Sequence, residues 1–216
     1  MDLALLLAGF AAGFVHVLMG PDHLAAVAPL AAAASRPGST GSGTEPKRSG
    51  TAPWRTGLRW GLGHSLGVAV VGLLALWLRD LLPLEALSRW SERAVGLVLL
   101  GLGTWGLFQL AGRVRPRTGR HAHAALSVGV LHGFAGSSHL LGVLPALALD
   151  SAASGVLWLI SFAAGTVVSM TGFSASLGGL ARRVGDAGAR LILGGSSTVA
   201  LAAGLWWLLR PLPTGL

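Results

Sequence analysis

The sequence predicts an all-α integral membrane protein whose six transmembrane helices form two inverted three-helix repeats. Three observations lead to this prediction. Of the 216 residues, 52% are hydrophobic and only 11% are charged, whereas a soluble domain carries roughly 25% charged residues. Six apolar segments follow one another along the chain, and a histidine motif near the start returns in the second half. We expect one membrane domain over residues 1–216.

The first apolar segment, residues 3–34, is too long for one straight span. A helix of that length would measure about 48 Å, against a hydrocarbon core of roughly 30 Å. Gly20 and Pro21 lie near its centre, and proline removes a backbone donor from a helix. We therefore expect a broken first helix, with Gly20 and Pro21 at the break. A flexible linker, residues 35–53, follows and is rich in Pro, Gly, Ser and Thr.

Five further apolar segments complete the predicted set of spans. They cover residues 54–78, 94–111, 124–149, 155–180 and 191–209. Basic residues gather in the first, third and fifth connections, of which the third is the basic loop 112–123, whereas the fourth carries only Asp150. By the positive-inside rule the basic connections are cytoplasmic. This pattern predicts a protein of the cell (inner) membrane with its N- and C-termini outside.

Three ionisable side chains flank the predicted helix break, namely His16, Asp22 and His23. Such groups are expensive at membrane depth and usually lie on an ion or proton path. Imidazole suits nickel, cobalt, copper, zinc and ferrous iron, and a carboxylate offsets part of the charge of a divalent cation. On an unbroken helix the two histidines would lie about 10 Å apart. The break is therefore what would bring them to one metal ion.

The second half repeats this pattern at a constant spacing of 116 residues. Gly13, His16, Gly20, His23 and Pro29 correspond to Gly129, His132, Gly136, His139 and Pro145. Three spans separate the copies, so the second copy enters the membrane from the opposite side. Many transporters use inverted repeats to place a substrate site near the midplane. We expect repeat 1 over residues 1–111, repeat 2 over residues 124–210, and a broken fourth helix at Gly136.

Further histidines extend the candidate metal site. His132 and His139 would complete the site or form a second one, and His64 inside the second span is a further candidate ligand or gate. His121 and His123 make the basic loop a candidate capture loop.

Structural alternatives exist for several of these residues. A membrane histidine such as His64 can serve as a helix–helix hydrogen-bonding residue, Asp22 can cap a half-helix, and the loop histidines can be plain solvated residues. The tryptophans, Trp60 included, are expected mostly as interfacial anchors.

Composition excludes other kinds of chemistry. The chain has no cysteine, so disulfides, thiolate metal sites and dithiol electron relays are absent. The net charge of +8 comes from residues in connecting loops, which indicates membrane topology and contact with the lipid bilayer and not nucleic acid.

Three motifs give the sequence a resemblance to a known family. They are His16-x5-Asp22-His23, Leu62-Gly63-His64-Ser65 and the string from Leu131 to Ser137. With these motifs the chain resembles the nickel/cobalt transporter superfamily, and within it the membrane branch of urease accessory protein H. The first motif is one residue longer than the His-x4-Asp-His of that family. The resemblance implies that His16, Asp22 and His23 bind the translocated metal.

The sequence thus predicts transmembrane transport of a divalent transition-metal cation. Nickel or cobalt is the expected substrate, with iron or zinc as alternatives; no organic cofactor and no enzymatic activity are expected. Glycine-rich helix faces would also allow a homo-oligomer. Two other functions stay open: a membrane metalloprotein or haem-binding protein that uses the histidine pairs for chemistry, and a transporter of small solutes or anions that binds charge at half-helix N-termini.

Overall fold

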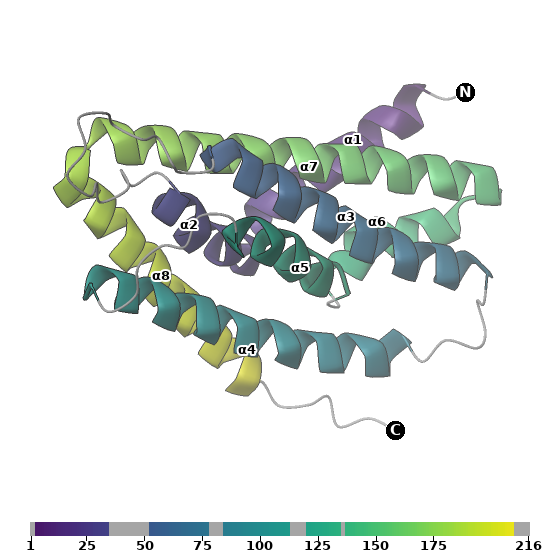
Figure 1. The fold of residues 1–216 in the computed structure, drawn as a ribbon. Coiled ribbons are helices and arrows are strands. Elements are labelled where there is room, and N and C mark those ends of the chain that lie inside the picture. The colour runs from purple at the N-terminus through teal and green to yellow at the C-terminus, as the bar shows by residue number, and fades with distance from the viewer. Residues whose placement is uncertain (1–2, 35–51, 78–83, 113–119, 135–136, 210–216) are drawn as a thin grey trace.

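The computed structural model describes residues 3–34, 52–77, 84–112, 120–134 and 137–209, without the side chains of residues 84–91, 120–123 and 137–141. Within these ranges the chain forms eight α-helices and no strand (Figure 1). They are α1 (Leu3–Met19), α2 (Pro21–Ala34), α3 (Pro53–Trp77), α4 (Leu84–Leu110), α5 (Arg120–Phe134), α6 (Ser137–Ala148), α7 (Ala152–Arg183) and α8 (Gly185–Leu209). The predicted all-α class is confirmed. The predicted linker, apart from its last two residues, lies outside the described residues.

Several of these helices are membrane-span candidates. Among the described residues, α3, the part of α4 from Glu92, α7 and α8 are each long and apolar enough to cross a membrane. A fifth candidate is the bent pair formed by α1 and α2. The protein is therefore a helical membrane protein. In Figure 1, α7 crosses the whole bundle, with α6 leading into one end and α8 leaving from the other.

The first apolar segment is broken at Gly20. Helices α1 and α2 meet there at an angle of 72°. The Gly20 amide donates to the carbonyl of His16 at 3.1 Å and so completes α1, while the Gly20 carbonyl accepts from His23 at 3.1 Å and so begins α2. Pro21 occupies the first position of α2, where a helix needs no amide donor. The chain thus changes direction without leaving these backbone groups unpaired.

The helices extend beyond the predicted spans at three connections. Helix α4 begins at Leu84, ten residues earlier than predicted, and α5 begins at Arg120, inside the predicted basic loop 112–123. Only Val184 separates α7 from α8, because Gly185 adopts a φ of +68° that turns the chain. Hydropathy marks the part of a helix that lies in hydrocarbon, and charged residues can continue the helix outside it. The helices of the structure are therefore longer than the apolar spans predicted from hydropathy.

Helix α1 packs along α7 by direct backbone contact. A Cβ atom at Gly13 would collide with the carbonyl of Phe162, and one at Gly165 would collide with the carbonyl of Phe10. Glycines at helix crossings permit such approach because they carry no side chain.

Helix α5 packs along α3 in the same way. A Cβ atom at Gly129 would collide with the carbonyl of Trp60, and one at Gly63 with the carbonyl of Leu126. Each position in α5 lies 116 residues after its counterpart in α1, and each position in α7 lies 102 residues after its counterpart in α3. The α1–α7 and α3–α5 crossings are therefore built from equivalent positions.

Helices α2 and α6 occupy different environments. In α2 every residue from Ala25 to Ala33 is buried, and the helix contacts α3, α4, α7 and α8. Helix α6 packs against α3 and α7, and among its described side chains Leu144 is half exposed. The first broken pair thus runs into the centre of the bundle, while the end of α6 lies at its surface.

The close α1–α7 crossing can be tested with two alanine variants of α7. We expect Gly165→Ala to destabilise the protein by about 1–3 kcal/mol, because the new methyl group overpacks the crossing. Gly172, where a Cβ atom would meet no atom within 4 Å, is the matched control. We expect Gly172→Ala to be neutral or slightly stabilising, since alanine is about 1 kcal/mol more favourable than glycine in the interior of a helix. Thermal unfolding in detergent measures both, and equal melting temperatures for the two variants would contradict the packing described.

Candidate metal centre

Three histidines from different helices meet in the interior. Nitrogen atoms of His16 in α1, His23 in α2 and His64 in α3 all lie within 4.8 Å of one another. The ring centroids are 4.6 Å apart for His16 and His23, 5.0 Å for His23 and His64, and 5.6 Å for His16 and His64. Three imidazoles at such distances form an arrangement that can close around one ion.

The helix break creates this meeting. His16 lies in the last turn of α1 and His23 in the first turn of α2, and the bend turns their side chains toward the same point. A Cβ atom at Gly20 would collide with the ring of His23. Glycine at this position therefore leaves room for the imidazole against the backbone of the break.

The cluster is buried on all sides by protein. His64 is fully buried, and the exposed fraction of His16 is 4%. The Nε2 atoms of His16 and His23 are buried and have no hydrogen-bond partner among the described residues. Buried nitrogen atoms in a native site usually have a partner, so these two atoms fit ligands of a bound ion.

Asp22 contacts the cluster through His23. The Nδ1–H of His23 donates to Oδ1 of Asp22 at 3.0 Å. This bond leaves the lone pair on Nε2 of His23, which is how carboxylates orient metal-binding histidines. The prediction of Asp22 as a metal ligand stays a prediction; in the structure one oxygen of its carboxylate holds the imidazole of His23. Its second oxygen, Oδ2, is buried without a hydrogen-bond partner among the described residues.

His132 lies beside the three-histidine cluster. Its ring centroid is 5.7 Å from that of His23, and its Nδ1–H donates to the carbonyl of Val128 at 3.1 Å. With Nδ1 as the donor, Nε2 is the nitrogen of the neutral His132 ring that carries the lone pair. The second copy of the repeated motif thus brings one histidine to the same place as the first copy.

Two aromatic rings that the sequence did not assign to the site lie against the cluster. Trp60 is stacked on His64, with ring planes 9° apart and centroids at 5.0 Å, and Phe162 lies 5.4 Å from His16. Trp60 is fully buried, so its assignment as an interfacial anchor was wrong. It lies one helical turn before His64, and that spacing could have indicated a shared face.

The residues next to His64 fix its position between helices. Gly63 admits the carbonyl of Leu126 in α5, and the hydroxyl of Ser65 donates to the carbonyl of Ala163 in α7 at 3.3 Å. The Leu-Gly-His-Ser motif therefore holds α3 against α5 on one side and α7 on the other.

The second-half motif meets this motif directly. A Cβ atom at Gly133 would collide with the carbonyl of His64, so the residue after His132 permits contact of the two helix backbones. The two motifs are thus parts of one packing unit.

Other predicted site residues are not placed at the cluster. Gly136 and the side chains of His139, His121 and His123 lie outside the described residues. The backbone of His121 and His123 belongs to the first turn of α5, and His139 follows the start of α6.

Comparison with known proteins finds relatives of two kinds. The first are two chloroplast proteins of Arabidopsis thaliana, FOR GROWTH AND FERTILITY 2 and FOR GROWTH AND FERTILITY 1. Both are 33% identical to this chain, over 91% and 94% of its length, but over only 54% and 58% of their own. The chain thus spans little more than half the length of these relatives.

The second kind is the urease accessory protein UreH of Bacillus sp. (strain TB-90). It is 25% identical over 82% of this chain and 77% of its own length. The chain is a distant homologue of these proteins. The likeness to UreH supports the resemblance of the motifs to the nickel/cobalt transporter superfamily, without separating its branches. No protein-family model and no solved structure matches the chain.

The role of Asp22 in orienting His23 can be tested by removing the charge of its carboxylate. We expect Asp22→Asn to weaken the binding of Ni²⁺ or Co²⁺ about 10–100-fold, as for other groups that orient a metal-binding histidine. Calorimetric titration of the purified protein measures the affinity. Asp186→Asn, at the exposed start of α8, is the control and is expected to bind as the wild type does. An unchanged affinity in Asp22→Asn would contradict the assigned role.

Proposed function

We propose that this protein transports a divalent transition-metal cation across a membrane. Nickel and cobalt are the first candidates for the substrate, and iron and zinc are alternatives. The observation that carries the proposal is the convergence of His16, His23 and His64 in the interior of a helical membrane protein. The distant homology to a urease accessory protein agrees with a role in metal handling.

The dimensions of the cluster suit one metal ion. A metal–nitrogen bond of about 2.1 Å places two nitrogen ligands of a tetrahedral ion about 3.4 Å apart. The nitrogen atoms of the cluster lie within 4.8 Å of one another, so small rotations of the imidazole rings would close them around an ion. His132, next to His23, would supply a further ligand in the same step.

The charge of the site suits transport better than permanent binding. Asp22 offers one negative charge to a divalent cation, and the histidines bind as neutral imidazoles. A partly compensated charge in a buried site binds the cation without holding it permanently. A carrier needs this balance, because a substrate that binds too tightly is not released.

We further propose six spans in two inverted repeats. Helices α5 and α6 would form a broken fourth span, as α1 and α2 form a broken first span. These two broken spans and the four single helices α3, α4, α7 and α8 make six spans. Two observations support this count. Helices α2 and α6 begin at Pro21 and Ser137, 116 residues apart, and the α1–α7 and α3–α5 crossings use equivalent glycine and carbonyl positions.

We place the protein in the cell (inner) membrane with both termini outside. The basic residues of the first, third and fifth connections support this orientation by the positive-inside rule. In this arrangement the connection between α6 and α7, which carries Asp150, faces the outside.

The same geometry argues against the alternative functions. A haem is a flat macrocycle far larger than an imidazole, and His16, His23 and His64 lie ring to ring with Trp60 stacked on the outer face. An anion at the start of α2 would meet the carboxylate of Asp22, which already occupies the positive end of the helix dipole. A cation without a macrocycle is the substrate that these surroundings favour.

Uptake by proteoliposomes tests the proposed function. We expect the wild-type protein to give saturable Ni²⁺ or Co²⁺ uptake that is lost in His16→Ala, His23→Ala and His64→Ala. In calorimetry each of these variants should bind at least 10–100-fold more weakly, because removing a ligand costs no less than removing a group that orients one.

Asp186→Asn, at the exposed start of α8, serves as the control for folding and insertion. It should bind the cation as the wild type does. If all three cluster variants transport like the wild type, the cluster is not the transport site. An absorption band of bound haem in the purified protein would favour the haem-binding alternative instead.

A further inference from the structure

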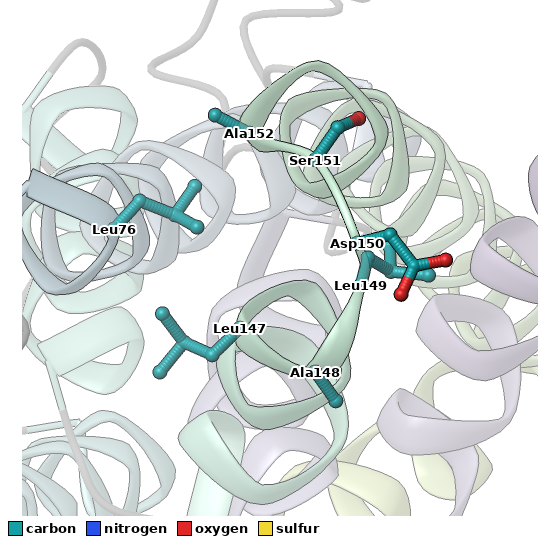
Figure 2. A pocket seen from close by; sticks show the side chains of 7 residues that line it. All are labelled: Leu76, Leu147, Ala148, Leu149, Asp150, Ser151 and Ala152. Carbon is teal, nitrogen blue, oxygen red and sulfur yellow. The ribbon is translucent and has the colours of Figure 1, made fainter.

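A pocket opens at one end of the bundle, at the connection between α6 and α7. Its volume is about 520 Å³, and it is lined by Leu76, Leu147, Ala148, Leu149, Asp150, Ser151 and Ala152. Figure 2 shows Leu76 of α3 and Leu147 of α6 on one side of the pocket and the carboxylate of Asp150 at the opposite rim. None of these residues belongs to the histidine cluster. The pocket therefore needs an explanation of its own.

The rim of this pocket is suited to a cation. Asp150 is the only charged residue in the connection between the two apolar segments, and its side chain is exposed. The last carbonyl groups of α6 lie at the same rim, and the C-terminal end of a helix carries partial negative charge. Both features raise the local concentration of cations.

An apolar plug separates the pocket from the histidines. We define the plug as Val68, Val71, Ala75, Val143, Ala146, Leu159 and Phe162, which form one buried cluster. On its outer side Leu76 and Leu147, which line the pocket, pack against it. On its inner side the ring of Phe162 lies 5.4 Å from that of His16, and Val68 follows His64 by one helical turn. Pocket, plug and histidines are therefore contiguous.

Phe162 occupies the inner end of the plug and closes it against α6. A Cβ atom at Gly142 would lie 3.2 Å from both the Phe162 ring and the side chain of Val68. A side-chain hydrogen bond joins α7 to α6, because the Trp158 indole N–H donates to the Gly142 carbonyl at 3.0 Å. Helix α6 also exposes Leu144 at the surface. Among the helices that contribute to the plug, α6 is the shortest, and it packs mainly on α7 and α3, so we take it as the element that moves.

We propose that the pocket beside Asp150 is the mouth of the cation path, and that Phe162 with Val68 and Val143 is its closed gate. Apolar constrictions close such paths by excluding water. Movement of α6 away from Phe162 would let water and a hydrated divalent cation pass from the mouth to His16 and His64. This inference rests on the proposed transport function and adds the route, the gate and the moving helix.

Because the chain has no cysteine, single-cysteine labelling of the whole chain in proteoliposomes, without metal, tests the proposal. A membrane-impermeant thiol reagent should label Leu147→Cys in the mouth quickly and Val143→Cys in the plug slowly. Adding Phe162→Ala to Val143→Cys should raise its labelling rate at least tenfold. Phe173→Ala, on the same helix but packed against a different apolar cluster, should leave that rate unchanged.

A second variant keeps the test decisive if Phe162→Ala fails to fold. Trp158→Phe removes the hydrogen bond to the Gly142 carbonyl while keeping an aromatic ring, and it should also speed labelling of Val143→Cys. Equal labelling rates of Leu147→Cys and Val143→Cys in the wild-type background would overturn the proposed gate. So would a rate that neither Phe162→Ala nor Trp158→Phe changes.

The mouth is tested separately by Asp150→Asn. We expect this variant to raise the KM of Ni²⁺ uptake at least threefold at low salt, with unchanged Ni²⁺ affinity in detergent, because only the supply of cation to the site changes. Asp186→Asn should leave the KM unchanged. An equal KM in the wild type and in Asp150→Asn would overturn the assignment of the pocket as the mouth of the cation path. Because the labelling needs no metal, a protein that labels as described but takes up no cation would refute the transport function and keep the gate.

Discussion

The break at Gly20 is the constraint on which the interior of this protein depends. It turns two histidines that an unbroken helix would hold about 10 Å apart into neighbours with ring centroids at 4.6 Å. It also places Asp22 at the start of α2, where the helix dipole favours a carboxylate and where its oxygen can hold the ring of His23. One change of chain direction thus positions two histidines, the carboxylate that contacts one of them, and the entry of α2 into the core.

Close contact between helix backbones keeps these groups in place. Gly63 and Gly133 allow α3 and α5 to meet at the level of His64, and Gly13 allows α1 to meet α7 at the level of Phe162. Such contacts leave little freedom for the helices to slide, because each carbonyl fits where a side chain would stand. The histidine cluster is therefore held by the packing of helix backbones against one another.

The two sides of the histidine cluster are covered by different kinds of structure. Trp60 and the buried helix α2 cover it on one side. On the other side an apolar plug ends at an open pocket, and the helix that completes the plug, α6, lies partly at the surface. The proposed transport function would use this asymmetry, because alternating access opens a carrier site to one side of the membrane at a time.

The sequence by itself determined the helical membrane class, the break at Gly20 and the residue types of the site, because hydropathy, proline chemistry and imidazole chemistry are local properties. It did not determine helix ends, since charged residues continue a helix beyond the hydrocarbon. Only the tertiary structure decided that His64 joins His16 and His23, that Asp22 contacts His23, and that Trp60 is buried. These facts depend on how separate helices cross, and the crossings are set by carbonyl groups that meet glycines far away in the chain.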